Sequence, residues 1–99
     1  MKVALASDIL PDKMKMVQYQ GQSVCVANVK GKYYAIGNTC THVGGPLVQG
    51  KLVAHTVECP WHGSQFDVTT GQVLRGPARA PEPVYEVKVE GTSILIRPK

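Results

Sequence analysis

The fold of this chain is decided by two short stretches, Cys40-Thr41-His42-Val43-Gly44-Gly45 and Cys59-Pro60-Trp61-His62-Gly63-Ser64. Each stretch offers one thiolate and one imidazole, the side chains that bind zinc and iron–sulfur clusters in proteins. In the first stretch the two side chains are two positions apart, so an extended backbone presents both on one face. In the second they are three positions apart, and a turn favoured by the proline and the glycine brings them together. The sequence therefore predicts a metal site formed by Cys40, His42, Cys59 and His62.

Two kinds of metal centre accept two cysteines and two histidines. In a [2Fe-2S] cluster, one iron takes both sulfur ligands and the other takes both imidazoles. The neutral imidazoles raise the reduction potential above that of an all-cysteine cluster. A single zinc ion takes the same four ligands in a tetrahedron. Ligand types and spacing by themselves leave both alternatives open.

The residues that flank the two stretches narrow this choice. Cys-Thr-His-x-Gly-Gly, followed by Cys-Pro-Trp-His-Gly-Ser-x-Phe-Asp, closely resembles the paired cluster-binding boxes of Rieske proteins. Asp67-Val68-Thr69-Thr70-Gly71 resembles the strand and turn that follow the second box. Gly76-Pro77-Ala78 resembles the family's proline loop, which covers the cluster from a third side. The resemblance extends from about Gly31 to Ala80.

This resemblance has direct implications for the cofactor and the fold. It implies one [2Fe-2S] cluster per chain, with Cys40, His42, Cys59 and His62 as ligands and the histidine pair facing solvent. It also implies a stack of antiparallel sheets in which the cluster lies at the tip of a small subdomain.

The residues around the boxes indicate which kind of Rieske protein to expect. Members in cytochrome bc complexes carry a second cysteine in each box and join the two loops by a disulfide, but those positions hold Gly45 and Trp61 here. Rieske oxygenase subunits attach the module to a large catalytic domain, for which 99 residues leave no room. The resemblance therefore implies a free-standing ferredoxin of the type without a disulfide, an electron-transfer protein rather than an enzyme.

Hydrogen bonds to the cluster sulfurs raise the potential, because they stabilise the more negative, reduced cluster. High-potential relatives donate from a serine and a tyrosine of the second box. Ser64 matches the serine, whereas Phe66 stands in the tyrosine position and has no hydroxyl. We therefore predict a low-to-intermediate potential within the Rieske range of about −150 to +300 mV.

The rest of the chain predicts an all-β scaffold. Valine, which favours strands, occurs 14 times in the sequence. Glycine turns at Gln20-Gly21, Lys30-Gly31, Thr70-Gly71 and Glu90-Gly91 separate short extended segments, as in a series of hairpins. We expect a single domain, 1–99, with a base made of residues 1–37 and 75–99. A loop-rich cluster-binding subdomain of about 38–74 is expected in the middle, because this part is rich in glycine and proline and poor in charge.

Charge and composition exclude several functional classes. The formal net charge is +4, without the basic run or aromatic-interleaved stripe that nucleic-acid binding requires. The apolar start of the chain is short and broken by Asp8, so neither a secretory signal nor a membrane segment is expected. Three cysteines, an odd number, argue against a disulfide framework and for a reducing compartment, which predicts a cytoplasmic protein.

Three functions remain to be compared. The first is a soluble, monomeric one-electron carrier between a reductase and an oxygenase or other redox enzyme, with transient contacts to both. The second is a permanent small subunit of a multisubunit enzyme, because Cys-Pro-Trp-His-Gly also resembles small nitrite reductase subunits. The third, ranked lower, is a zinc-stabilised interaction module, which would be colourless and free of acid-labile sulfide.

Three further residues have chemistry of their own. Cys25 lies in an apolar strand far from both boxes and is interpreted as a small core residue. His55 is interpreted as an ordinary residue of the strand that leads to Cys59, not as a third histidine ligand. Trp61 is compatible with shielding the cluster, with docking a partner and with packing in the core, and these roles stay open.

Overall fold

The computed structural model of the chain describes residues 2–41, 44–61 and 63–98. Within these ranges, two single turns of 3₁₀ helix lie among strands and loops, and they are η1 (Ala6–Asp8) and η2 (Leu47–Gln49). The strands are β1 (Lys2–Leu5), β2 (Met14–Tyr19), β3 (Gln22–Val29), β4 (Lys32–Gly37), β5 (Lys51–Val53), β6 (Thr56–Glu58), β7 (Gln65–Asp67), β8 (Val73–Arg75), β9 (Val84–Glu90) and β10 (Ser93–Pro98). The described ranges hold no helix that is long and apolar enough to cross a membrane.

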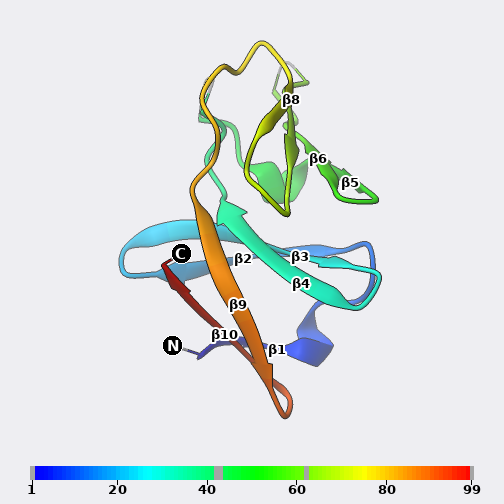
Figure 1. Cartoon of the computed structure of the whole chain (residues 1–99), viewed down its shortest axis with the longest axis vertical. Helices are drawn as coiled ribbons and strands as arrows, with labels where there is room; N and C mark the ends of the chain where they lie inside the picture. Colours follow the sequence, from blue (N-terminus) through cyan, green and yellow to red (C-terminus); the bar gives the residue numbers. More distant parts are fainter. Residues whose placement is uncertain (1, 42–43, 62, 99) are drawn as a thin grey trace.

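The strands form two antiparallel sheets. The larger has the order β1-β10-β9-β4-β3-β2, and the smaller has the order β5-β6-β7-β8. In Figure 1 the smaller sheet lies above the larger one, and two chain segments cross between them, after β4 and before β9. The predicted all-β fold, a stack of antiparallel sheets with a small piece inserted in the middle, is confirmed.

Tight turns explain how the larger sheet is built. Gln20 and Gly21 connect β2 to β3, and both have positive φ, 50° and 78°. Lys30 and Gly31 connect β3 to β4 in the same way, with φ of 54° and 90°. Two central residues with positive φ define a type I′ turn, whose twist matches that of the flanking strands. These two hairpins are the ones that the glycine positions predict.

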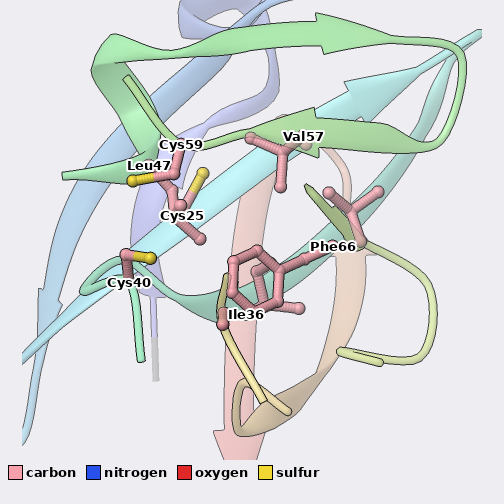
Figure 2. Packing of buried hydrophobic residues seen from close by; sticks show 10 residues of the cluster. Cys25, Ile36, Cys40, Leu47, Val57, Cys59 and Phe66 are labelled. Carbon is pink, nitrogen blue, oxygen red and sulfur yellow. The ribbon is translucent and has the colours of Figure 1, made fainter. Parts of the chain in front are cut away.

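Strand β3 is the centre of the molecule because it is buried on both faces. Val24 and Val26 face one core, and Cys25 and Ala27 face the other. The first, the sheet core, is enclosed by the larger sheet and consists of Ala4, Ile9, Val17, Tyr19, Val24, Val26, Ala35, Ile94 and Ile96. The second, the interface core, joins the two sheets and consists of Cys25, Ala27, Ile36, Cys40, Leu47, Val57, Cys59, Phe66, Val68 and Ala78. The interpretation of Cys25 as a core residue is therefore confirmed (Figure 2).

One local prediction is wrong. His55 lies in a turn between β5 and β6, beside Ala54 with its positive φ of 53°, and not in a strand. Its Nδ1 atom is 3.5 Å from Oδ1 of Asp67. A short run of alternating residues around His55 does not distinguish a strand from the tip of a tight hairpin, and here the hairpin forms.

Candidate metal centre

Each predicted box forms a six-residue loop that is closed by a hydrogen bond between its first and last residues. In the first ligand loop, residues 40–45, the N–H of Cys40 donates to the carbonyl of Gly45 at 2.8 Å. In the second ligand loop, residues 59–64, the N–H of Cys59 donates to the carbonyl of Ser64 at 2.7 Å. The first loop follows β4, and the second connects β6 to β7. Both cysteines therefore occupy the same place in equivalent loops, at the point where the chain leaves regular structure.

The two loops bring the sulfur atoms of Cys40 and Cys59 into one buried region. The side chains belong to the interface core, and only 2% and 1% of these residues is exposed (Figure 2). Burial raises the pKa of the Cys59 thiol, the Trp61 N–H lowers it in part, and the neighbouring Cys40 thiol raises it again. Two adjacent buried thiols of this kind lose their protons when a metal binds, because the metal ligand is the thiolate.

The histidine half of the predicted ligand set cannot be compared with the structure. His42 and His62 lie outside the described residues. Within the described part of the chain, no group of three or more histidine, cysteine, aspartate or glutamate side chains could hold a metal ion. The structure thus brings together Cys40 and Cys59, and the complete set of four ligands stays a prediction.

Gly45 allows the two ligand loops to approach each other closely. A Cβ atom on Gly45 would lie 2.8 Å from Sγ of Cys59 and 3.1 Å from the Trp61 ring. The N–H of Trp61 donates to the same Cys59 sulfur at 3.4 Å. Trp61 is 49% exposed, so its ring lies over Gly45 without entering the core. Of the three roles considered for Trp61, shielding and docking remain.

Ser64 connects the second ligand loop to the predicted proline loop. Its side chain is fully buried, and its Oγ accepts a hydrogen bond from the N–H of Ala78 at 3.0 Å. Pro77 itself is exposed, but its neighbour Ala78 is buried in the interface core. Because the Ser64 oxygen acts as acceptor here, its own proton is available to donate to a sulfur atom of a bound cluster.

Phe66 lies in the core beside the ligand loops. It is on β7, fully buried, and belongs to the same interface core as Cys40 and Cys59. Its ring packs with Ile36 in the close view (Figure 2). A hydroxyl group added to this ring would therefore be placed in a dry region near the ligand sulfurs.

A second group of interactions, which local sequence patterns did not indicate, involves Thr41 and Glu82. Oγ1 of Thr41 donates to the carbonyl of Ala80 at 2.6 Å. The carboxyl of Glu82 is buried, which raises its pKa to about 7, and the backbone N–H of Thr41 opposes this rise as a hydrogen-bond donor. The available signal was a single acid between two prolines in Pro81-Glu82-Pro83, directly after the predicted proline loop.

Comparison with known proteins identifies the class to which this fold and site belong. The Rieske [2Fe-2S] domain family matches residues 1–93. The chain therefore belongs to the Rieske [2Fe-2S] domain family.

Several of its relatives are ferredoxins. The chain is 36% identical over 90 residues to the ferredoxin component of the naphthalene 1,2-dioxygenase system of Pseudomonas putida, covering 91% of this chain and 86% of the relative. It is 35% identical over 97 residues to ferredoxin CarAc of Metapseudomonas resinovorans, covering 97% and 91%. The solved ferredoxin of carbazole 1,9a-dioxygenase from Nocardioides aromaticivorans IC177 superposes with a TM-score of 0.95 at 35% identity, over 100% of this chain and 97% of that one. Like these ferredoxins, the chain is an electron-transfer protein and not an enzyme.

The described residues fit the family's cofactor. Two buried sulfur atoms are adjacent, a backbone N–H donates to one of them, and a glycine leaves room beside it. The chain binds one [2Fe-2S] cluster, which supplies a site that gains and loses one electron. The family match therefore favours the [2Fe-2S] cluster over zinc, the alternative that the ligand spacing left open.

The position of Phe66 in the core can be tested through the reduction potential of the cluster. Phe66→Tyr is expected to raise the reduction potential, because a hydroxyl near the ligand sulfurs stabilises the reduced cluster. A net hydrogen bond of about 1 kcal/mol corresponds to roughly 40 mV for one electron. Redox titration of both proteins measures the difference, and Phe66→Leu, which adds no hydroxyl, serves as the control. An unchanged or lower potential in Phe66→Tyr would show that Phe66 does not occupy the tyrosine position.

A substitution at Ser64 should change the reduction potential in the opposite direction. Ser64→Ala is expected to lower the potential by a similar amount, because the buried hydroxyl that would donate to a sulfur is removed. The change also leaves the N–H of Ala78 without its acceptor, so the thermal midpoint should fall as well. Ser7→Ala, at an exposed serine of η1, is the control. A potential equal to that of the wild type, in a variant that retains its cluster, would contradict the assigned donor.

Proposed function

We propose that this protein carries single electrons from a reductase to the terminal oxygenase of a dioxygenase system. Support comes from ferredoxin components of such systems, which it resembles over nearly its whole length. A solved complex of reduced oxygenase and oxidized ferredoxin in carbazole 1,9a-dioxygenase contains a ferredoxin that superposes with a TM-score of 0.91 at 35% identity, over 97% of this chain and 90% of that one. That observation carries the proposal, because it pairs a close relative with an oxygenase.

The proposed ligands are Cys40 and Cys59 on one iron and His42 and His62 on the other. The two cysteine positions are supported by their equivalent places in the two ligand loops. The two histidines follow from the resemblance, which also implies that they face solvent and lie on the route of the electron. Replacing thiolates by neutral imidazoles on the iron nearer to solvent makes that iron easier to reduce.

The surface beside the second ligand loop is suited to a brief contact with a partner. Trp61 is half exposed, and residues 38–74 contain only three charged side chains other than histidine, Lys51, Glu58 and Asp67. A small, weakly charged contact allows fast release, which a carrier needs because it must leave its donor before it reaches its acceptor. We therefore propose transient docking of both partners at this end of the molecule.

Further expectations belong to the same proposal. The electron donor is a reductase, the protein is a cytoplasmic monomer, and the single domain divides into a base, 1–37 and 75–99, and a cluster-binding subdomain of about 38–74. The arrangement of the four short strands β5 to β8 in a sheet of their own supports the division. The likeness to ferredoxin components supports a soluble carrier.

Anaerobic mixing experiments test the proposal. The purified protein is mixed with the reductase of a dioxygenase system and, after reduction, with the oxygenase, while the cluster absorbance is recorded. We expect reduction by the first and reoxidation by the second, together with an EPR spectrum of a cluster with mixed cysteine and histidine ligands after reduction by dithionite. An all-thiolate spectrum would contradict the ligand set, and zinc without acid-labile sulfide would contradict the cofactor.

Gel filtration separates the carrier from the permanent subunit. A carrier elutes as a monomer and stays separate from a nitrite reductase-like large subunit at micromolar concentration. Stable co-elution with such a subunit, without electron transfer to an oxygenase, would favour the second function.

A further inference from the structure

We propose that Arg75 and Arg79 form a docking site for a carboxylate-bearing face of the reductase that supplies the electron. This inference rests on the proposed function and adds to it the chemistry of the surface that one of the two partners recognises.

Arg79 is held beside both ligand loops by its two neighbours in the chain. On one side, the N–H of Ala78 donates to Oγ of Ser64 in the second ligand loop at 3.0 Å. On the other side, the carbonyl of Ala80 accepts a hydrogen bond from Oγ1 of Thr41 in the first ligand loop at 2.6 Å. Arg79 itself is exposed. The backbone that carries this cation is therefore attached to both loops, while the residue stays open to solvent.

Arg75 lies at the same end of the molecule, on the smaller sheet. It is the last residue of β8 and is paired with Gln65 of β7 in the strand register. Gln65 directly follows Ser64, which ends the second ligand loop. Figure 1 shows the chain after β8 at the tip of the molecule, opposite the turn between β9 and β10. The two arginines thus stand at the two ends of one loop, residues 75–79, which contains the proline loop.

No acid in the described part of the chain neutralises these two cations. Neither arginine forms an ion pair or a side-chain hydrogen bond with another described residue. No aspartate or glutamate occurs in residues 68–81, and Glu82, the next acid along the chain, is only 4% exposed. The charge of this loop is therefore available to a partner.

The acids of the smaller sheet are engaged in contacts of their own. Oε1 of Glu58 accepts a hydrogen bond from Nε2 of Gln65 at 3.0 Å. Oδ1 of Asp67 accepts hydrogen bonds from the N–H and the hydroxyl of Thr69, and it lies 3.5 Å from Nδ1 of His55. A guanidinium group binds a carboxylate through two parallel hydrogen bonds, so carboxylates are the groups that fit two unpaired arginines.

Apolar groups accompany the two cations. Pro77 is exposed and lies between the arginines in the chain, and Trp61 of the second ligand loop is 49% exposed. Protein interfaces are enriched in aromatic and arginine side chains and combine an apolar centre with a polar rim. The composition of this surface is therefore that of a protein-binding site.

The change of charge at the cluster decides which partner an acidic face suits. A [2Fe-2S] cluster with two thiolate and two neutral imidazole ligands has no net charge when oxidised and one negative charge when reduced. An acidic face therefore binds the oxidised carrier more tightly than the reduced one, because the added electron repels carboxylates. A reductase binds the oxidised carrier and releases the reduced one, so this preference speeds its turnover. An oxygenase with an acidic face would instead retain its product, the oxidised carrier.

Binding measurements at two ionic strengths test the proposal. The dissociation constant of the oxidised protein for the reductase used in the mixing experiments is measured by isothermal titration calorimetry. Arg75→Gln, Arg79→Gln and the double variant remove charge, whereas Arg79→Lys keeps the charge without the planar guanidinium. Lys88→Gln is the control, because it removes the charge of an exposed lysine of β9 in the larger sheet.

Each single Gln variant is expected to bind the reductase about two- to fivefold more weakly at low salt, and the double variant about tenfold more weakly. These losses should shrink at high salt, because exposed charges are then screened. Arg79→Lys should lose less than Arg79→Gln, and Lys88→Gln should bind like the wild type. Reduced wild-type protein should bind the reductase more weakly than oxidised protein. All variants should keep the cluster absorbance and the thermal midpoint of the wild type, because the substituted side chains are exposed.

Wild-type affinity of the double variant at low salt would overturn the docking site. A loss that appears with the oxygenase and not with the reductase would overturn the assignment of the partner. Failure of the wild-type protein to bind or to be reduced by the reductase would overturn the proposed function and this inference with it. Normal reduction of the wild type without any loss in the arginine variants would overturn the inference alone, so the two failures are distinguishable.

Discussion

Cys59→Ala is expected to give a colourless protein without acid-labile sulfide, whereas Cys25→Ala keeps the cluster. Both cysteines are fully buried in the interface core, so burial does not distinguish them. Their backbone positions distinguish them, because Cys59 begins a ligand loop and Cys25 lies in the middle of a central strand. Loss of one of two thiolate ligands leaves an iron without half of its protein attachment, and the cluster should not assemble.

The control works because Cys25 is inert. Burial raises its pKa to about 12, and the charge of Glu82 adds to the rise. Cys25 therefore stays protonated, while metal binding requires a thiolate. Its thiol donates a weak hydrogen bond to the sulfur of Met14 at 3.6 Å. Removing the sulfur leaves a small cavity and should cost about 1 kcal/mol of stability.

The measurements are the visible absorbance, the iron and sulfide content and the thermal midpoint. Cys59→Ala should contain almost no iron and should melt at a lower temperature, because binding of the metal centre contributes to folding. Retention of a normal cluster in Cys59→Ala, or its loss in Cys25→Ala, would contradict the assignment of Cys59 as a ligand.

The second large effect is expected for Gly71→Ala, in comparison with Gly21→Ala. The two glycines have almost the same backbone conformation, with φ of 77° and 78°. A left-handed conformation costs an alanine about 1–2 kcal/mol at either position. At Gly21 a Cβ atom would meet nothing within 4 Å. At Gly71 it would lie 2.3 Å from the carbonyl oxygen of Glu82 and 2.7 Å from Cγ2 of Val84.

The difference between the two variants isolates the crowding at Gly71. Overlap with a backbone atom adds about 1–3 kcal/mol or more, because the backbone cannot move aside as the end of a side chain can. For a domain of this size about 1 kcal/mol lowers the thermal midpoint by about 4–8 °C. Circular dichroism should therefore show a clearly larger drop for Gly71→Ala. Equal midpoints for the two variants would show that Glu82 and Gly71 are not in close contact.

Local sequence patterns were sufficient where neighbours along the chain decide the structure. The turns at Gln20-Gly21 and Lys30-Gly31 form as predicted, because glycine accepts the positive φ that a two-residue hairpin requires. The same kind of pattern was insufficient at His55. That residue turned out to lie in a hairpin tip, since strand and turn are hard to separate over a few residues.

Local sequence patterns could not identify contacts between residues that are far apart in the sequence. Ser64 was singled out from the motif, but its partner Ala78 is 14 positions away and became visible only in the folded chain. The contact of Thr41 was missed for the same reason, since its partner Ala80 is 39 positions away in the sequence. No periodicity links positions 41 and 80, and only packing brings them together.

The sequence by itself predicted the class of cofactor and the all-β architecture, and it singled out the cysteine positions that are proposed as ligands. These depend on ligand chemistry, on the motif that surrounds it and on glycine turns, all of which are local properties. Only the tertiary structure decided that both cysteines begin equivalent closed loops, that β3 contributes residues to two cores and that Thr41 of the first ligand loop donates a hydrogen bond to Ala80. The physical reason is that burial, close approach and hydrogen bonding between distant segments are properties of the packed chain, and they arise only when the two sheets meet.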